Sequence, residues 1–206
     1  VRWHQLRIPF RFRYGHAARV HNGVESVYCE VIAGDGITGW GECVPRPYVS
    51  GETVASVMED GPALSPATFE ADPFAALDQR TADWPSGRPW PAAALCALEN
   101  ALLDAAGKAA QQPVAALFGD ASNSPVTLTA SIGIAPPAVL ISLCLAYRAK
   151  GFRSFKIRVG RDDDLGRLRL IRRVLGNDVR IYADANSAWT LEEATRRIHA
   201  LADAGV

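Results

Sequence analysis

The chain has 206 residues, of which 49% are hydrophobic, and its 22 basic residues balance its 22 acidic residues. This composition allows one or two domains with buried cores, and the balanced charge gives no electrostatic support for a nucleic-acid partner or an anionic membrane. No apolar run is long enough to span a bilayer, and the alternating first residues do not resemble a signal peptide. Because the sequence does not begin with Met, we expect a few residues to precede Val1.

The first part of the chain is rich in strand signals. Residues 2–8 alternate in polarity, residues 24–33 are rich in Val, Tyr and Ile, and residues 37–42 follow a turn formed by Gly34, Asp35 and Gly36. These patterns predict three antiparallel strands with one apolar face. The polar residues 16–23 predict a loop between the first two strands.

Helices are predicted after these strands. Ser50 is expected to cap a helix that begins near Glu52, and Pro91 stands at the first turn of a helix over residues 92–107. Apolar residues recur at helical spacing along the second helix, which predicts a core-facing side. On its exposed side Asp104 and Lys108 are one turn apart, and we expect them to form an ion pair.

The pattern of predicted strands and helices changes after a stretch of small and polar residues at positions 119–125. We therefore place one domain over residues 1–122 and a second over residues 123–206. In the second domain strands alternate with long helices, which is typical of parallel βαβ units. The expected strands cover residues 126–132, 154–159 and 179–183, and the expected helices cover residues 137–150, 162–175 and 190–204. The pattern alone fits the beginning of a barrel or of a doubly wound sheet, with Gly151 and Gly176 ending two helices.

Polar side chains gather at the expected carboxyl ends of the second and third of these strands, where functional groups collect in α/β folds. Lys156 and Arg158 are two residues apart and therefore share one face of their strand, and Asp184 and Asn186 follow the next strand. A carboxylate beside cations suits a hard metal ion and an anionic substrate, although the metal needs more oxygen ligands than Asp184 supplies. The alternative is that Asp184 only opens a turn and pairs with Lys156.

Three further patterns indicate structure rather than binding. Residues 34–39 formally match a dinucleotide fingerprint, but a strand follows where the fingerprint needs a helix N-terminus. A cluster of arginines is expected mostly on the polar, solvated face of an amphipathic helix, namely Arg161, Arg167, Arg169, Arg172 and Arg173. The widely spaced Cys29, Cys43, Cys96 and Cys144 indicate buried thiols in a reducing cytoplasm, with a disulfide between the first two as a less favoured alternative.

Three motifs, in this order, resemble the muconate-lactonizing subgroup of the mandelate racemase/muconate lactonizing enzyme family, within the enolase superfamily. The first is GWGE at residues 39–42 with the loop over residues 45–53, and the second is ALENALLDAAGK at residues 97–108. The third is the pair of strand-end motifs, Lys-x-Arg at residues 156–158 and Asp-Ala-Asn at residues 184–186. The resemblance covers nearly the whole chain. It implies an α+β capping domain followed by part of a (β/α)8 TIM-like barrel.

The resemblance also implies chemistry. Family members are Mg²⁺-dependent isomerases and lyases that abstract a proton alpha to a carboxylate to form a metal-stabilised enediolate, as muconate cycloisomerase, o-succinylbenzoate synthase and dipeptide epimerase do. By this resemblance Asp184 is a metal ligand, Lys156 holds or polarises the substrate carboxylate, and position 158 is the place of the acid/base lysine. The implied partners are a small carboxylate substrate and, in the complete protein, further copies of the same chain in a homo-oligomer. Neither nucleic acid nor a membrane is implied.

The sequence departs from the family pattern in two ways. Position 158 is Arg158, and because arginine stays protonated we expect it to bind an anion rather than act as a base. This argues against racemisation with a base on each face and against a direct carry-over of cycloisomerase or o-succinylbenzoate synthase chemistry. The chain also stops after the third βα unit, before the strands that carry the family's other acidic ligands and its opposite-face lysine. We therefore expect it to be a fragment of a longer protein.

Two loops of the capping domain, at residues 14–22 and 46–51, match by position the loops that close over the barrel mouth and select substrate. The candidate substrate-binding residues are His16, Arg19, Arg46 and Tyr48, together with Asn186 of the barrel. The alternative for each loop residue is an ordinary solvated side chain. An acid-sugar dehydratase and a non-catalytic relic of the fold remain as alternative functions, the second because of Arg158.

Overall fold

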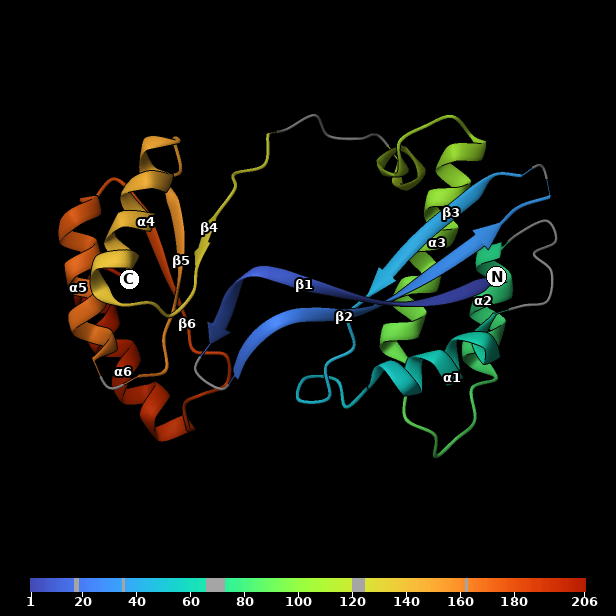
Figure 1. The fold of residues 1–206 in the computed structure, drawn as a ribbon, viewed down its shortest axis with the longest axis horizontal. Helices are drawn as coiled ribbons and strands as arrows, with labels where there is room; N and C mark the ends of the chain where they lie inside the picture. The colour runs from blue at the N-terminus through green and yellow to red at the C-terminus, as the bar shows by residue number, and fades with distance from the viewer. Residues whose placement is uncertain (17–18, 35, 66–72, 120–124, 162) are drawn as a thin grey trace. The chain divides into compact units, whose positions relative to one another are not determined.

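The computed structural model describes residues 1–16, 19–34, 36–65, 73–119, 125–161 and 163–206, and the side chains of residues 12–21, 73 and 76 also lie outside the description (Figure 1). The chain divides into two compact units. We call residues 1–9 and 23–123 the N-terminal unit, and residues 10–22 and 124–206 the βα unit. In the described residues no helix has the length and apolar character needed to cross a membrane.

The N-terminal unit is a three-stranded sheet with helices packed against it (Figure 1). The strands of this sheet run in the order β1 (Arg2–His16), β2 (Arg19–Ile32) and β3 (Thr38–Cys43), and β2 pairs with β3 in antiparallel register. Residues 10–16 of β1 and residues 19–22 of β2 are counted in the βα unit. The helices are α1 (Val54–Leu64), α2 (Pro73–Ala82) and α3 (Ala92–Ala109), followed by a 3-10 turn, η1 (Val114–Phe118). Helix α3 lies directly against β3, and its apolar residues face the core, as their helical spacing predicts. Asp104 and Lys108 form the predicted ion pair at 2.7 Å.

The hairpin of β1 and β2 differs from its prediction. Residues 16–23 are predicted as a loop, but β1 continues to His16 and β2 begins at Arg19. Aromatic residues at positions 10, 12 and 14 favour extended backbone, and pairing between neighbouring strands does not require apolar side chains. The turn that joins β2 to β3 is closed by Ala33, whose amide donates to the Ile37 carbonyl at 2.8 Å, while Asp35 lies outside the described residues.

The first helix begins at Val54, after Thr53 rather than Ser50. The Thr53 hydroxyl accepts from the Ser56 amide at 3.0 Å, and the Ser56 hydroxyl accepts from the Thr53 amide at 2.9 Å. This reciprocal capping box satisfies two amide groups at the helix start, so Thr53 is the better cap. The Ser50 amide instead donates to the Arg46 carbonyl in the preceding loop. The helix α2 and the turn η1 have weak apolar periodicity and are not predicted from the sequence.

The βα unit is a parallel sheet in the order β4 (Ala130–Ile132), β5 (Ser154–Arg158) and β6 (Arg180–Asp184). It carries the helices α4 (Pro137–Ala149), α5 (Asp164–Leu175) and α6 (Leu191–Asp203). The predicted alternation of strands and helices is confirmed, and the positive φ angles of Gly151 and Gly176 end α4 and α5 as expected. Strand β4 is shorter than the predicted 126–132, because Val126 and Leu128 find no burial and only three residues pair with β5.

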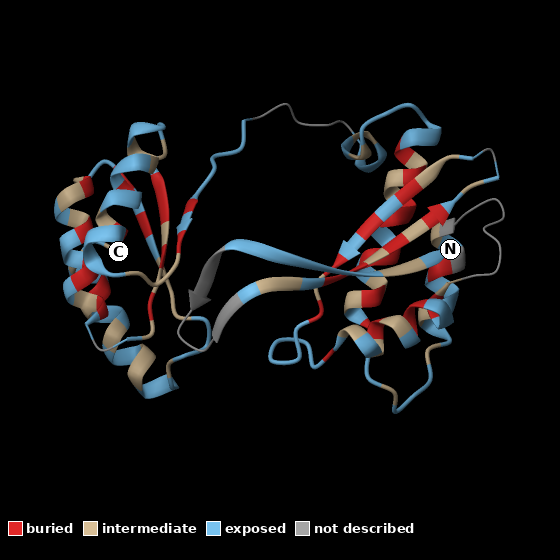
Figure 2. Cartoon of the chain, in the orientation of Figure 1, coloured by how far each residue is buried: buried red, intermediate tan, exposed pale blue. Residues whose placement is uncertain are grey.

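The buried residues form a separate core in each unit (Figure 2). In the βα unit the core includes Phe155, Ile157 and Ile181 from the strands, packed against residues of the helices such as Leu168 and Ile171. Since side chains alternate along a strand, the intervening residues of β5 and β6 point to the other face of the sheet. That face carries the polar residues of the candidate site.

Candidate functional site

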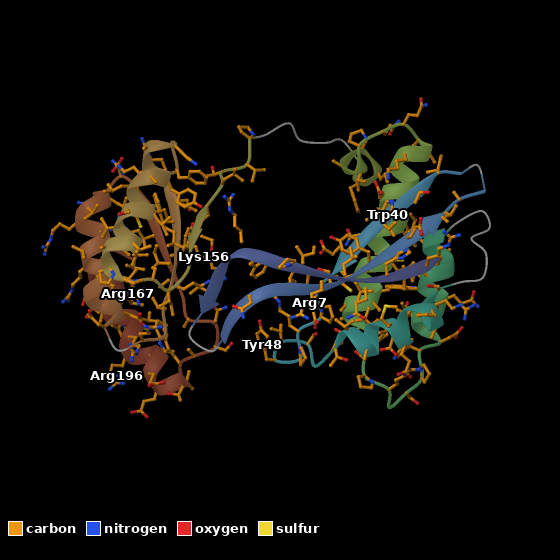
Figure 3. All side chains as sticks on the ribbon, viewed as in Figure 1. Arg7, Trp40, Tyr48, Lys156, Arg167 and Arg196 are labelled. Carbon is orange, nitrogen blue, oxygen red and sulfur yellow. The ribbon has the colours of Figure 1, made fainter. Side chains whose placement is uncertain are left out.

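The site lies at the carboxyl ends of β5 and β6. The parallel register places Arg158 of β5 opposite Asp184 of β6. Phe155 and Ile157 are completely buried on the helix side, so Lys156 and Arg158 share the opposite face, as their spacing predicts. Figure 3 shows the Lys156 side chain beside the strands of this sheet. Two cations and a carboxylate therefore meet at one sheet edge.

Asp184 is bonded to both cations. Lys156 Nζ lies 2.8 Å from Asp184 Oδ2, and Arg158 Nη1 donates to the same oxygen. The Arg158 side chain is only 15% exposed, whereas that of Lys156 is 42% exposed. Charge-assisted hydrogen bonds of this kind are about twice as strong as neutral ones, so Asp184 is firmly held.

The backbone of the Asp-Ala-Asn segment turns so that Asn186 contacts the Asp184 carboxylate. The Asn186 amide donates to Asp184 Oδ1 at 2.9 Å, and Arg158 Nη1 donates to Asn186 Oδ1. Asn186 and Ser187 have φ angles of 48° and 60°, in the left-handed region that asparagine tolerates better than most residues. Asp184 therefore opens a turn and also pairs with Lys156, which is the structural alternative weighed from the sequence. Both interactions coexist with a position suited to chemistry.

These contacts keep Asp184 ionised. Its partial burial acts to raise the pKa, but hydrogen bonds from Lys156 and the Asn186 amide, with the positive charges of Arg158 and Lys156, outweigh it. The pKa of Asp184 therefore lies below its usual value. An ionised carboxylate at a strand end is a suitable oxygen ligand for a hard cation. The described residues contain no group of three or more His, Cys, Asp or Glu side chains that could hold a metal, so Asp184 can supply one ligand of a larger set.

Further residues share this face of the sheet and are not singled out by sequence motifs. The register places Ser131 of β4 beside Lys156, and Lys156 beside Tyr182 of β6. Ser131 and Tyr182 are exposed: both neighbours of Ser131 are buried, and Tyr182 stands between the buried Ile181 and the half-buried Ala183. The signal that identifies them is the period of two along each strand, once the parallel pairing is known.

Two of the five arginines predicted on a solvated helix face are not solvated. Arg167 is only 8% exposed and donates to Asp164 Oδ1 at 2.8 Å. Arg172 is half-buried and donates to the carbonyl oxygens of Gly176 and Val179 at 2.9 and 2.8 Å. The prediction of solvated side chains is wrong for these two residues, because a long arginine side chain near the edge of the apolar face can reach buried hydrogen-bond partners.

The structure describes the side chains of only some of the candidate residues in the capping loops. Arg46 and Tyr48 are exposed in the loop that follows β3. His16 ends β1 and Arg19 begins β2, but their side chains lie outside the described residues. Their contact with a substrate stays a prediction. The four cysteines are free thiols, of which Cys96 is exposed and not buried as predicted, and burial raises the pKa of Cys29 and Cys43 to about 12.

Two family models match the chain. Residues 8–119 match the mandelate racemase / muconate lactonizing enzyme N-terminal domain, and residues 140–206 match the enolase C-terminal domain-like model. The chain therefore belongs to the mandelate racemase/muconate lactonizing enzyme family of the enolase superfamily, as its motifs predict. The matches do not single out the muconate-lactonizing subgroup.

Several enzymes of this family are similar to the chain. It is 32% identical over 187 residues to a hydrophobic dipeptide epimerase of Enterococcus faecalis, covering 87% of this chain and 51% of that protein. It is 33% identical over 198 residues to an o-succinylbenzoate synthase of Geobacillus stearothermophilus, covering 93% and 50%. The chain thus spans about half the length of these relatives.

Solved structures of the family share the fold. The dipeptide epimerase from Enterococcus faecalis, complexed with Mg and the dipeptide L-Leu-L-Tyr, is 29% identical with a TM-score of 0.85, covering 98% of this chain and 57% of that one. The N-succinyl Arg/Lys racemase from Bacillus cereus is 25% identical with a TM-score of 0.88, covering 99% and 56%. The predicted fold class is confirmed: an α+β capping fold is followed by the first βα units of a TIM-like barrel.

Proposed function

We propose that this chain is part of a magnesium-dependent isomerase or lyase that removes the proton alpha to the carboxylate of a small acid. The observation that carries the proposal is the meeting of Lys156, Arg158 and Asp184 at the carboxyl ends of β5 and β6. Its support from relatives is that the similar enzymes include an epimerase, a racemase and a synthase of one family.

Asp184 would supply one oxygen ligand to Mg²⁺. Its lowered pKa and its place at a strand end fit a hard cation, and the Asn186 amide holds one carboxylate oxygen in a fixed orientation. When bound, the metal supplies positive charge that offsets the charge developing on the substrate carboxylate. The described residues contain no group of three or more His, Cys, Asp or Glu side chains that could hold the ion, so further ligands would come from elsewhere in the protein.

Lys156 would bind the substrate carboxylate. Its ammonium group is partly exposed and has three donors, of which Asp184 occupies one. A lysine in this position can orient a carboxylate and stabilise negative charge as the alpha carbon loses its proton. Asn186 would contribute a further polar contact beside it.

Arg158 would act electrostatically and not as a base. Its guanidinium stays charged at any working pH, and it is bonded to both Asp184 and Asn186. A residue from elsewhere in the protein would then abstract the proton, so the chemistry would be one-sided. This favours elimination or another single-face reaction over racemisation, although the relatives include both kinds of enzyme.

The remaining roles follow from the same assignment. Residues 1–122 would form the capping domain and residues 123–206 the start of the barrel, with His16, Arg19, Arg46 and Tyr48 in contact with the substrate. We expect a homo-oligomeric protein that works in the reducing cytoplasm. We expect the narrower activity to be that of a muconate cycloisomerase, an o-succinylbenzoate synthase or a dipeptide epimerase. The alternatives are an acid-sugar dehydratase and a fold without turnover.

Exchange of the alpha proton in deuterated water tests the proposal. The full-length protein is incubated with each enantiomer of hydrophobic dipeptides and N-succinyl amino acids, with Mg²⁺ or with a chelator. We expect Mg²⁺-dependent deuterium incorporation from one enantiomer only, and a loss of about 10²–10³-fold in Asp184→Asn, because the weakened metal site supplies less of the positive charge that stabilises the transition state. Equal Mg²⁺ affinity of Asp184→Ala and wild type would rule out the metal assignment.

The role of Arg158 has its own test in the same assay. Arg158→Lys is expected to gain exchange from the second enantiomer, because a lysine can be deprotonated near neutral pH when partly buried. Comparable exchange from both enantiomers in wild type, abolished for one of them in Arg158→Met, would show that Arg158 is a base. No exchange from any substrate in the panel would favour the relic.

A further inference from the structure

A buried carboxylate anchors the turn between β5 and α5. Asp164, the first residue of α5, is only 2% exposed. Its Oδ2 accepts hydrogen bonds from the amides of Gly160 and Arg161 at 2.6 and 2.7 Å. These two amides lie two and three residues after Arg158, the last residue of β5, so the carboxylate fixes the backbone just beyond the end of the strand.

Arg167, one turn along the same helix, connects this carboxylate to the candidate site. Its Nη1 donates to Asp164 Oδ1 at 2.8 Å, and its Nη2 donates to the carbonyl oxygen of Arg158 at 3.3 Å. Figure 3 labels Arg167 on α5. Because both charges are buried, each is strongly unfavourable without the other, and the pair therefore holds a single arrangement.

Arg158 is fixed on both sides by these contacts. Arg167 binds the Arg158 carbonyl, and the next amide, that of Val159, donates to the Asp184 carbonyl at 3.0 Å. The Arg158 side chain then donates to Asp184 and Asn186. We propose that Asp164 and Arg167 are positioning residues, which set the place of the Arg158 guanidinium beside Asp184. The inference rests on the proposed electrostatic role of Arg158.

A simple helix-start clamp is the alternative, and Arg167→Lys separates the two. A lysine keeps the charge that faces Asp164, but its ammonium lacks the planar fork that reaches Asp164 and the Arg158 carbonyl together. A clamp of the helix start needs only the first contact. A positioning role needs both.

The test is made on the full-length protein labelled with ¹⁵N-arginine and observed by NMR. In Arg167→Lys and in Asp164→Asn we expect hydrogen exchange of the buried Arg158 side-chain Nε–H to accelerate by about tenfold or more, because losing a charge-assisted hydrogen bond that holds the end of β5 lets water reach this group. The matched controls are Arg148→Lys and Asp178→Asn, at an ion pair of 3.1 Å in the same unit. The controls should leave the Arg158 exchange rate unchanged.

Each outcome decides the inference. If exchange of the Arg161 backbone amide accelerates while the Arg158 side chain keeps its wild-type rate in both variants, the pair only clamps the turn and the inference is wrong. Should one variant fail to fold, the other variant is compared with wild type in the same way. An equal acceleration of Arg158 side-chain exchange in the control variants would also overturn the inference. Alpha-deuterium exchange is measured in parallel: its absence in wild type refutes the proposed function, while the NMR result still decides the positioning role.

Discussion

The two units use their sheets in opposite ways. In the N-terminal unit, glycines of β3 allow the backbone of α3 to lie directly on the strand: a Cβ at Gly41 would overlap the Ala97 carbonyl oxygen and come within 2.6 Å of the Ala101 amide nitrogen. In the βα unit, large side chains such as Phe155 and Ile157 separate strand from helix, and the other face carries ionic groups. The sheet of the N-terminal unit therefore serves to pack a helix closely, and the sheet of the βα unit carries the candidate site.

This difference explains what the family-like motifs are for. The GWGE motif and the α3 motif meet each other: the Trp40 amide donates to Asp104 Oδ2 at 2.8 Å, and Lys108 Nζ donates to the Thr38 carbonyl at 2.8 Å. Strand β3 is the edge of its sheet, so these side chains satisfy backbone groups that no further strand would pair. The GWGE residues and the α3 motif are therefore structural, whereas Lys-x-Arg and Asp-Ala-Asn form the candidate site.

The largest effect is expected from removing the close approach in the N-terminal unit. Gly41→Ala should destabilise this unit by about 3 kcal/mol, because backbone atoms of α3 cannot move away from the new methyl group without shifting the helix. Gly34→Ala is the matched control, since nothing lies within 4 Å of its Cβ position. It should change stability by less than about 1 kcal/mol.

Urea denaturation followed by tryptophan fluorescence measures this effect. Trp3, Trp40, Trp84 and Trp90 belong to the N-terminal unit, and Trp189 belongs to the βα unit. The fluorescence therefore reports mainly the unit that the substitution affects. An unchanged urea midpoint in Gly41→Ala would show that α3 does not need the glycine, and the contrast between the two sheets would fail.

The sequence predicts best what depends on local pattern. The helix α3, the parallel strands and the shared face of Lys156 and Arg158 follow from spacing, because periods of 3.6 and 2 are set by the backbone itself. Chain order also places Asp184 correctly, since parallel strands bring their carboxyl ends to one edge. The family resemblance adds the roles.

Features that depend on distant partners could not be predicted in this way. Arg167 has the charge of a solvated residue, but Asp164 and the Arg158 carbonyl bury it. The contact of Asp104 with the Trp40 amide joins residues 64 positions apart, and no local pattern encodes it. The length of β1 and β2 beyond their predicted ends depends on the pairing of the two strands with each other. In each case the missing information is a tertiary contact.

A smaller effect is expected from the edge of β3. Asp104→Asn should cost about 1.5 kcal/mol, since it weakens charge-assisted bonds to Lys108 and the Trp40 amide that are partly exposed. Glu99→Gln, at an exposed position of the same helix, is the control. Thermal denaturation near neutral pH measures both. Equal stability of the two variants would contradict the role of Asp104 as a link to the strand edge.

The Asp104 contribution should also depend on pH. Partial burial acts to raise its pKa, but the bonds from Lys108 and Trp40 outweigh this, so the pKa in the folded protein lies below the ordinary 3.8. A lowered folded pKa means that the stabilisation is complete above pH 3.8 and is lost as pH falls through the folded value. The stability difference between wild type and Asp104→Asn should therefore shrink below pH 3.8. A constant difference would contradict the assignment.

The smallest effects are expected from removing a helix N-cap of the same type in each unit. Thr53 caps α1 and Thr190 caps α6, each in a capping box, with Ser56 and Glu193 as the reciprocal side chains. Thr53→Ala and Thr190→Ala should each cost about 1 kcal/mol, because an amide at the helix start loses its acceptor. Fluorescence should detect the first substitution more strongly than the second, while circular dichroism detects both.

The two capping boxes differ chemically, because of their two reciprocal side chains only that of Glu193 can titrate. Its hydrogen bond from the Thr190 amide holds the pKa of Glu193 below the ordinary 4.5, so its contribution is complete above pH 4.5 and is lost as pH falls through the folded value. The stability difference between wild type and Glu193→Gln should therefore vanish in acid, whereas that between wild type and Ser56→Ala should stay constant. Hydrogen exchange of the Thr190 and Thr53 amides resolves the two. If both amides respond equally to pH, the titration belongs to another group, and the βα unit would have no acid-sensitive cap of its own.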